Sequence, residues 1–163
     1  MTLRIGINGF GRIGRLVCRA IYETGRKDIT LAAINDPGGN FFPLLKYDSI
    51  HGRAPFEVIR ESDDWLNIAG QRVHRFRSRE VGELHWDREG VDIVLECTGK
   101  FNDRESAAKH LAQGAKKVLI SAPAKDEDLT VVYGVNHGAL KKEHKIVSNG
   151  SCTTNCLAPV AYV

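Results

Sequence analysis

The chain has 163 residues, and its 23 Lys and Arg against 20 Asp and Glu leave a formal net charge of +3. So small an excess gives no reason to expect nucleic acid or an anionic membrane as the main partner. No run approaches the ~18 apolar residues of a membrane helix, and the arginines near the start of the chain leave no signal-peptide core.

The first predicted elements are a strand, a glycine-rich turn and a helix. Residues 3–8 (LRIGIN) form a short apolar run, and the following GFGRIG places Gly9, Gly11 and Gly14 in G-x-G-x-x-G spacing. After this turn, mostly apolar residues recur three and four positions apart, which predicts the buried face of a helix that ends before Gly25. This face comprises Ile13, Leu16, Val17, Ala20, Ile21 and Thr24. A second strand is predicted at 29–35 (ITLAAIN), with Asp36 directly after it.

This order of elements predicts a dinucleotide site. Gly9 permits the sharp turn, Gly11 lets backbone N–H groups approach a pyrophosphate, and Gly14 lets the helix pack against the strand. Asp36, roughly twenty residues past Gly14, has the spacing of an acid that accepts hydrogen bonds from the adenosine ribose. A carboxylate there repels a 2′-phosphate, so the sequence favours NAD over NADP. The alternative is a glycine-rich turn in an unrelated α/β fold, which the complete order of elements disfavours.

The remaining chain alternates between predicted strands and helices. Residues 37–55 predict an irregular surface excursion, and residues 65–77 predict an antiparallel hairpin around Gly70-Gln71. A helix is predicted at 102–115, with further strands at 91–99, 116–123, 130–136 and 144–149. The fold class is therefore α/β: a Rossmann-type doubly wound, mostly parallel sheet with a small antiparallel hairpin insertion. Its ligand edge, at the carboxyl ends of the strands, collects Asn8, Asp36, Thr98, Gly99, Ser121 and the cysteine segment described next.

A second candidate site is the segment KIVSNGSCTTNC (145–156), which runs from a strand into a predicted helix start. Ser151 has the position of an N-cap, which places Cys152 in the first turn, where the helix end favours the thiolate. Cys156 lies one turn further along and is expected to face the core. No nearby histidine or further cysteine completes a metal site, so no metal is predicted. The four cysteines are too sparse and uneven for a disulfide framework, which predicts a reducing, cytoplasmic setting.

A thiolate at the ligand edge of a nicotinamide-binding sheet suits the oxidation of an aldehyde. The thiolate would add to the aldehyde to give a hemithioacetal, and hydride transfer would leave a thioester open to a second nucleophile. A buried structural cysteine is the alternative. The Ser and Thr residues on both sides of Cys152 disfavour it.

Seven stretches resemble the phosphorylating glyceraldehyde-3-phosphate dehydrogenase family, and together they extend over the whole chain. They are IGINGFGRIGR, AINDP, KYDSIHGR, ECTG, GAKKVLISAP, VYGVNH and SNGSCTTNCLAP. The resemblance implies that Cys152 is the catalytic nucleophile and that Arg12, Ile13 and Asp36 hold the adenosine and pyrophosphate portion of NAD. It also implies that Arg79 lies near the adenine and Ser121 near the nicotinamide half. Ser151 and Thr153 would bind inorganic phosphate or the phosphate of glyceraldehyde 3-phosphate.

Two departures from the family pattern accompany this resemblance. Gly150 stands where the family usually has alanine, and the stretch PGGNFFPLL after Asp36 differs from the expected sequence. We expect a NAD-binding domain at 1–150 and the nucleophile segment with the start of the following helix at 151–163. The family's second domain carries a histidine general base and most contacts of a homotetramer, and neither His137 nor His144 maps onto that base.

The sequence therefore predicts a chain that binds NAD without useful turnover, and whose face toward the second domain is apolar. Three alternatives stay open. An erythrose-4-phosphate dehydrogenase would share these motifs. A non-catalytic NAD-binding or redox-sensing module would use Cys152 only as an oxidisable thiol. A structural interaction protein would keep the pocket as a vestige.

Overall fold

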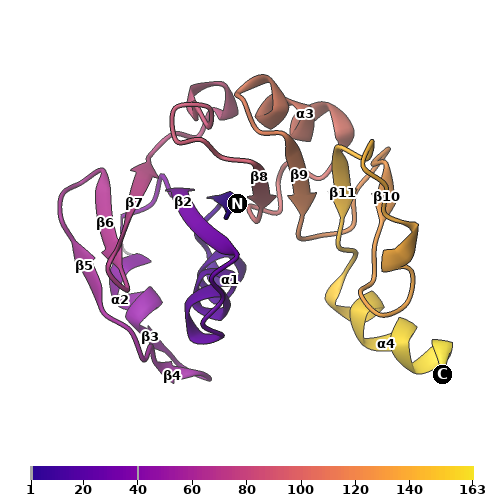
Figure 1. Cartoon of the computed structure of the whole chain (residues 1–163), viewed down its shortest axis with the longest axis horizontal. Helices are drawn as coiled ribbons and strands as arrows, with labels where there is room; N and C mark the ends of the chain where they lie inside the picture. The colour runs from indigo at the N-terminus through magenta and orange to yellow at the C-terminus, as the bar shows by residue number, and fades with distance from the viewer. Residues whose placement is uncertain (1, 40) are drawn as a thin grey trace.

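The computed structural model describes residues 2–39 and 41–163. Its main feature is a nine-stranded sheet in the order β10-β11-β9-β8-β1-β2-β7-β6-β5, which arches across the molecule (Figure 1). Seven of these strands pair in parallel: β1 (Leu3–Asn8), β2 (Ile29–Asn35), β7 (Gln71–Phe76), β8 (Ile93–Glu96), β9 (Lys117–Ile120), β10 (Leu129–Thr130) and β11 (Ile146–Ser148). The predicted doubly wound α/β class is confirmed.

The helices cover both faces of this sheet. They are α1 (Arg12–Glu23), α2 (Phe41–Lys46), α3 (Arg104–Ala112) and α4 (Cys152–Tyr162), with short 3-10 turns at Val81–Glu83 and His137–Ala139. Helix α1 lies on the inner side of the arch and α3 on the outer side (Figure 1). Within the described residues, no helix combines the length and the apolar character needed to cross a membrane.

The strand order reverses at β1. The chain moves outward from β1 to β2 and β7, and then returns to place β8, β9 and β11 on the other side of β1. In doubly wound sheets such a reversal opens a crevice at the carboxyl ends of the strands, where ligands bind. The fold therefore predicts a ligand-binding site at the carboxyl ends of β1 and β8.

Helix α1 forms where it was predicted, but it turns a different face inward. The buried positions are Gly14, Cys18, Arg19 and Ile21, whereas Ile13 is 49% exposed and Ala20 is also exposed. The close approach of Gly14 to the strand sets this rotation, because a Cβ at Gly14 would lie 2.2 Å from the carbonyl oxygen of Gly9. The predicted face that included Ile13, Ala20 and Thr24 is therefore wrong in part.

Residues 37–39 and 41–55 are more regular than predicted, and position 40 of this predicted excursion lies outside the described residues. They contain α2 and a small antiparallel pair, β3 (Tyr47–Asp48) with β4 (Gly52–Arg53). The rings of Phe41 and Phe10 meet edge to face at 5.4 Å, and the Phe41 side chain is buried in the core. Pro43 fits within the first turn of α2, where backbone N–H groups have no partner inside the helix. Proline therefore did not exclude a helix here.

The antiparallel hairpin is confirmed, with a small shift of its turn. Strand β6 (Trp65–Ile68) pairs with β7, and the turn residues Ala69 and Gly70 have φ angles of 53° and 82°. Strand β5 (Val58–Arg60) continues this antiparallel part. Because β7 also pairs in parallel with β2, the hairpin extends the main sheet instead of standing apart from it.

The second half of the sheet has shorter strands than predicted. Only Leu129–Thr130 is extended in the region of the strand expected at 130–136. The side chain of Asn136 folds back, accepting from the N–H of Val132 at 2.7 Å and donating to the carbonyl of Thr130 at 2.9 Å. These bonds close a loop, so the strand predicted there is wrong. Helix α3 is confirmed, with the Asp103 side chain accepting from the N–H of Ser106 at 2.8 Å.

Candidate functional site

A pocket of about 350 Å³ opens at the carboxyl ends of β1, β2 and β8. It is lined by Asn8, Gly9, Phe10, Gly11, Asn35, Asp36, Pro37, Ser78, Arg79, Cys97, Thr98, Lys100 and Phe101. A larger hollow of about 490 Å³ lies at the opposite edge of the sheet, near Arg4, Asp92 and Lys116. That edge holds the beginnings of the strands, whereas ligands of such sheets bind at the carboxyl ends, so the smaller pocket at the strand reversal is the candidate site.

The glycine turn forms one wall of this pocket. Gly9 has a φ angle of 89°, and a Cβ there would lie 2.7 Å from the backbone nitrogen of Thr98. Gly9 and Gly14 are therefore required by close packing. Gly11 differs, because a Cβ there would meet no atom of the described residues within 4 Å.

Gly11 leaves the beginning of α1 open. It is the N-cap residue, and none of the described side chains caps the helix by a hydrogen bond. The first N–H groups of a helix lack partners within the helix and carry its positive dipole end, which makes them a binding site for an anion. The space above Gly11 therefore fits a pyrophosphate that approaches the backbone closely.

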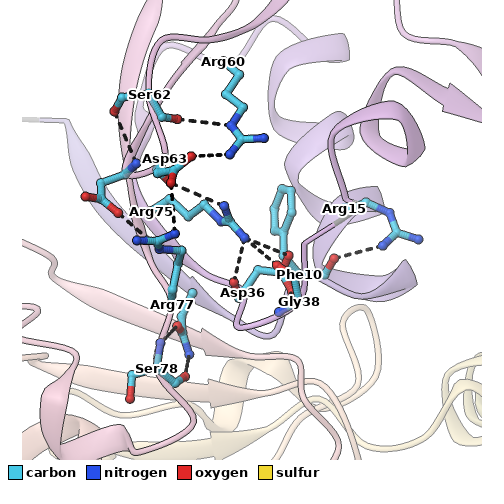
Figure 2. Close-up of polar contacts among 12 residues, drawn as sticks. Phe10, Arg15, Asp36, Gly38, Arg60, Ser62, Asp63, Arg75, Arg77 and Ser78 are labelled. Atoms are coloured by element: carbon cyan, nitrogen blue, oxygen red, sulfur yellow. Dashed lines mark hydrogen bonds and ion pairs between the residues drawn. The ribbon is translucent and has the colours of Figure 1, made fainter.

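Asp36 stands at the end of β2 on the opposite wall. Its carboxylate accepts a hydrogen bond of 3.3 Å from the N–H of Gly38 and lies 3.8 Å from a guanidinium nitrogen of Arg75 (Figure 2). Burial raises the pKa of Asp36, and the Gly38 N–H and the charges of Arg75 and Arg15 oppose that shift. The residue can accept hydrogen bonds from sugar hydroxyls while it is ionised.

A buried polar network supports the floor of the pocket. Glu96 is 1% exposed, and its Oε2 accepts from Asn8 Nδ2 at 2.6 Å and is 2.9 Å from His110 Nε2. The indole N–H of Trp86 donates to His110 Nδ1 at 3.0 Å. Because an indole N–H can only donate, the proton of His110 lies on Nε2 and points to Glu96. The other carboxylate oxygen accepts from the N–H of Thr98 at 2.8 Å and from its hydroxyl. The buried carboxylate of Glu96 thus fixes Asn8 and Thr98, which line the pocket.

The cysteine segment lies at the end of β11 and has a different character. Gly150 takes a φ angle of 69°, and the Ser151 hydroxyl then accepts from the N–H of Thr154 at 3.0 Å as a helix N-cap. Cys152 is exposed in the first turn of α4, as predicted. Cys156 is also exposed, so the expectation that it faces the core is wrong. No residue of α4 is buried, and no other element of the described chain covers its outer side.

Comparison with known proteins agrees with this arrangement. Residues 3–104 match a family model described as "Glyceraldehyde 3-phosphate dehydrogenase, NAD binding domain". The chain belongs to this family. The glyceraldehyde-3-phosphate dehydrogenase of Pseudomonas aeruginosa is 56% identical over 167 residues, and that of Xanthobacter flavus is 54% identical over 165. Both alignments cover 100% of this chain and 49% of the relative. The chain therefore spans about half the length of the curated relatives it matches, and NAD is the cofactor of the domain it contains.

The pocket brings together many of the residues expected to bind the cofactor of this family. Asn8, Gly9, Gly11, Asp36, Arg79 and Thr98 line it. Arg12 is turned to Asp48, to which it donates at 3.0 and 3.4 Å. Ile13 is half exposed outside the lining, and Gly14 is buried beneath the turn. Gly99 and Ser121 also lie outside it, and the Ser121 hydroxyl donates to the carbonyl of Glu96 at 3.0 Å.

Sequence reasoning missed several residues of the pocket wall. They are Phe10, Asn35, Ser78, Cys97, Lys100 and Phe101. Asn35 could have been predicted from the sequence, because it is the last residue of a predicted strand. Its amide donates to the Asn8 side chain at 2.8 Å and to the carbonyl of Ser78 at 2.9 Å. Ser78 enters the site only because β7 pairs with β2, which the hydrophobic pattern did not indicate.

Proposed function

We propose that this chain is the NAD-binding part of a dehydrogenase that oxidises and phosphorylates glyceraldehyde 3-phosphate to 1,3-bisphosphoglycerate. The observation that carries the proposal is the combination of an open glycine turn at β1 with an exposed Cys152 at the beginning of α4. Both follow the carboxyl ends of parallel strands in one sheet.

The cofactor would lie along the pocket with its pyrophosphate at Gly11 and the first turn of α1. Asp36 would receive the hydroxyls of the adenosine ribose, and Arg79 would contact the adenine side. Asn8, Gly9, Thr98 and Gly99 would form the wall beside the cofactor, with Ser121 toward the nicotinamide. Gly14 would contribute through packing, and Arg12 and Ile13 would act from the exposed side of the first helical turn.

Cys152 would carry the chemistry on the substrate. Its thiolate would form a C–S bond to the aldehyde carbon and give a hemithioacetal, which is then oxidised to a thioester. Bound NAD would supply the hydride acceptor for this oxidation. A phosphate oxygen would next attack the thioester carbonyl, so that the C–S bond breaks and Cys152 leaves as a thiolate.

The phosphate groups would lie beside the nucleophile, at Ser151 and Thr153. The hydroxyls of these two residues are 2.8 Å apart, and Thr153 is exposed. The histidines nearest in sequence make local bonds: His137 Nδ1 accepts from the N–H of Gly134 at 3.0 Å, and His144 Nδ1 from that of Lys141 at 3.2 Å. Neither is assigned as the general base.

We further propose that residues 1–150 are the NAD-binding domain and 151–163 the nucleophile segment, with substrate binding completed by a second domain in a homotetramer. Leu157, Val160 and Tyr162 of α4 are 67%, 74% and 68% exposed, which supports an apolar surface made for a partner domain. A reducing, cytoplasmic setting suits the four free thiols of the chain.

Calorimetric titration of the purified chain with NAD and with NADP tests the proposal. We expect saturable binding that favours NAD by about tenfold or more, an interval of ~1.4 kcal/mol in binding free energy. No binding to either dinucleotide by a folded chain would contradict it. Because closing an enclosed site can contribute ~7–11 kcal/mol to a reaction, the chain alone should show negligible NADH formation.

Substrate assays on a longer protein that includes this chain would separate the remaining readings. NADH formation that depends on glyceraldehyde 3-phosphate supports the proposed reaction, whereas a preference for erythrose 4-phosphate would reassign the substrate. Absence of any aldehyde-dependent NADH formation, with NAD binding intact, would favour a non-catalytic NAD-binding or redox-sensing module.

A further inference from the structure

Arg75, a residue of β7 that the sequence did not single out, lies directly beneath Asp36. Its side chain is 4% exposed. One guanidinium nitrogen, Nη2, donates to the carbonyl of Asp36 at 3.1 Å and to the carbonyl of Gly38 (Figure 2). The other, Nη1, donates to the carbonyl of Asp63 at 3.3 Å. The guanidinium thus connects the turn after β2 with the loop before β6.

A cation in this position is costly. Burial lowers the pKa of Arg75, and the charge of Asp36 opposes that shift. The Nε atom of Arg75 is buried and has no hydrogen-bond partner among the described residues. A buried cation with an unused donor is often no more stabilising than an apolar side chain of similar volume. The centre of the Phe41 ring lies 4.8 Å from the guanidinium carbon of Arg75, and an apolar side chain at this position could pack against the same ring. Stability alone therefore does not account for an arginine here.

Apart from Arg75, the turn is held at its first residue by the N–H of Asp36, which donates to the carbonyl of Phe76 at 3.1 Å. Within the described residues, the Asp36 carboxylate has one hydrogen bond, the 3.3 Å contact from the N–H of Gly38. Gly38 and Gly39 follow Pro37, and glycines lose more conformational freedom on ordering than any other residue. Arg75 fixes two carbonyls of this turn and lies 3.8 Å from the carboxylate itself.

We propose that Arg75 is a positioning residue that sets the preference of this pocket for NAD over NADP, by fixing the turn that carries Asp36. The inference rests on the proposed function, in which Asp36 receives the ribose hydroxyls. A fixed carboxylate can accept from both hydroxyls of NAD, and it stands in the place that the 2′-phosphate of NADP would need. A carboxylate on a loose turn can rotate away, which weakens the contact with NAD and removes the obstacle to NADP.

Two effects of removing Arg75 have opposite signs, so they can be told apart. Loss of a positive charge would weaken NADP more than NAD, because NADP carries the additional phosphate. Loss of the fixed turn would weaken NAD more than NADP. The guanidinium bonds of Arg75 go to the turn itself and its charge is already opposed by Asp36, so we expect the second effect to dominate.

The test is calorimetric titration of the purified chain and its Arg75→Met variant with NAD and NADP. We expect NAD binding to weaken about tenfold and NADP binding to change less than threefold, so that the preference for NAD falls. Arg72→Met is the matched control: Arg72 is on the same strand but is exposed, pairs with Glu61 at 3.0 Å and stacks on Trp65. The control should keep the wild-type ratio.

Two further variants keep the test decisive. Arg75→Lys retains the charge, but one ammonium cannot bridge the three carbonyls together, so it should lose part of the preference even if Arg75→Met fails to fold. In an Asp36→Asn background, Arg75→Met should change NAD binding less than threefold, because Arg75 acts through Asp36.

The outcomes separate the inference from the proposed function. Equal weakening of both dinucleotides in the folded Arg75 variants, or an unchanged or increased preference for NAD, would overturn the positioning role. If the wild-type chain bound neither dinucleotide, the proposed function itself would fail. A wild-type preference for NAD that survives the loss of Arg75 would leave the function standing and remove only this inference.

Discussion

The two halves of the ligand edge are built in different ways. Around the glycine turn, Asn8 and Thr98 are held by a buried network in which Glu96 and His110 are at most 1% exposed. Around Cys152, the support is local: a side-chain cap from Ser151 and a helix with no buried residue. The pocket at the strand reversal is therefore held by a buried network within this chain, whereas Cys152, the proposed nucleophile, lies on an exposed helix. Substitutions of the buried residues in the first region should alter both folding and binding, and those in the second region should remain local.

The largest effect is expected at Gly14. A Cβ there would lie 2.2 Å from the carbonyl oxygen of Gly9, and neither backbone segment can move without disturbing the turn. Gly14→Ala should lower the free energy of unfolding by about 3 kcal/mol or more and abolish NAD binding. Urea unfolding followed by the fluorescence of buried Trp86 measures the first effect, and calorimetry measures the second.

Gly11→Ala is the matched control for this prediction. A Cβ at Gly11 would lie more than 4 Å from every other atom in the part of the chain that the structure describes, and the φ of −69° at Gly11 suits any residue. The variant should change stability by less than about 1 kcal/mol while it weakens NAD binding strongly, because the methyl group enters the space of the pyrophosphate. If Gly11→Ala bound NAD normally, the pyrophosphate would not approach this turn.

The next effect is expected at Glu96. Both carboxylate oxygens accept hydrogen bonds, from Asn8 and His110 on one side and Thr98 on the other. Glu96→Gln turns one oxygen into an N–H donor that faces donors, and an unsatisfied buried polar group costs about 1–3 kcal/mol. We expect urea unfolding to shift by that amount, while the exposed control Glu105→Gln shows little change. A neutral result at Glu96 would contradict the assigned direction of these bonds.

The features of the ligand edge that could be predicted from the sequence are those encoded by residues close together in the chain. The glycine turn, β2 and Asp36 are encoded within a single short stretch, because glycine spacing and strand periodicity are local signals. The N-cap at Ser151 is local as well. These elements and the sheet class were predicted from the sequence and are confirmed.

The errors arise where distant parts of the chain meet. Arg75 reaches the Asp36 turn from 39 positions away, through the parallel pairing of β7 with β2, which no local signal indicates. The rotation of α1 depends on the contact of Gly14 with Gly9, and glycine does not count in an apolar pattern. Cys156, one turn after Cys152, was expected to face the core, but nothing in the described chain covers this side of α4.

A smaller effect is expected from acid. Burial raises the pKa of Asp36 above its usual 3.8, and the positive charges that face it are Arg75 from β7 and Arg15 from α1. Because the proposed contact with the NAD ribose uses the ionised carboxylate, the affinity for NAD should be full well above this raised pKa and should fall as the pH decreases through it. Titrations from pH 8 to pH 4 measure this decline. Asp36→Asn, which cannot ionise, should bind NAD more weakly and without the decline. A parallel decline in that variant would mean that another group is responsible.

The smallest effect on global stability is expected from loss of the N-cap of α4. The N-cap of α3 serves as the comparison. Ser151 accepts from the N–H of Thr154 at 3.0 Å, and Asp103 accepts from that of Ser106 at 2.8 Å at the beginning of α3. Removal of a serine cap costs a helix about 1 kcal/mol. In Ser151→Ala this loss should appear as faster amide exchange at Thr154 and Asn155 with no shift in urea unfolding, because α4 can fray without exposing core.

Asp103→Ala should instead lower the urea midpoint, because α3 buries Ala107 and His110 and cannot open separately from the core. Equal shifts of the midpoint in the two variants would show that α4 unfolds together with the sheet. The nucleophile would then be held as firmly as the cofactor pocket, and the difference between the two halves of the ligand edge would lie only in exposure.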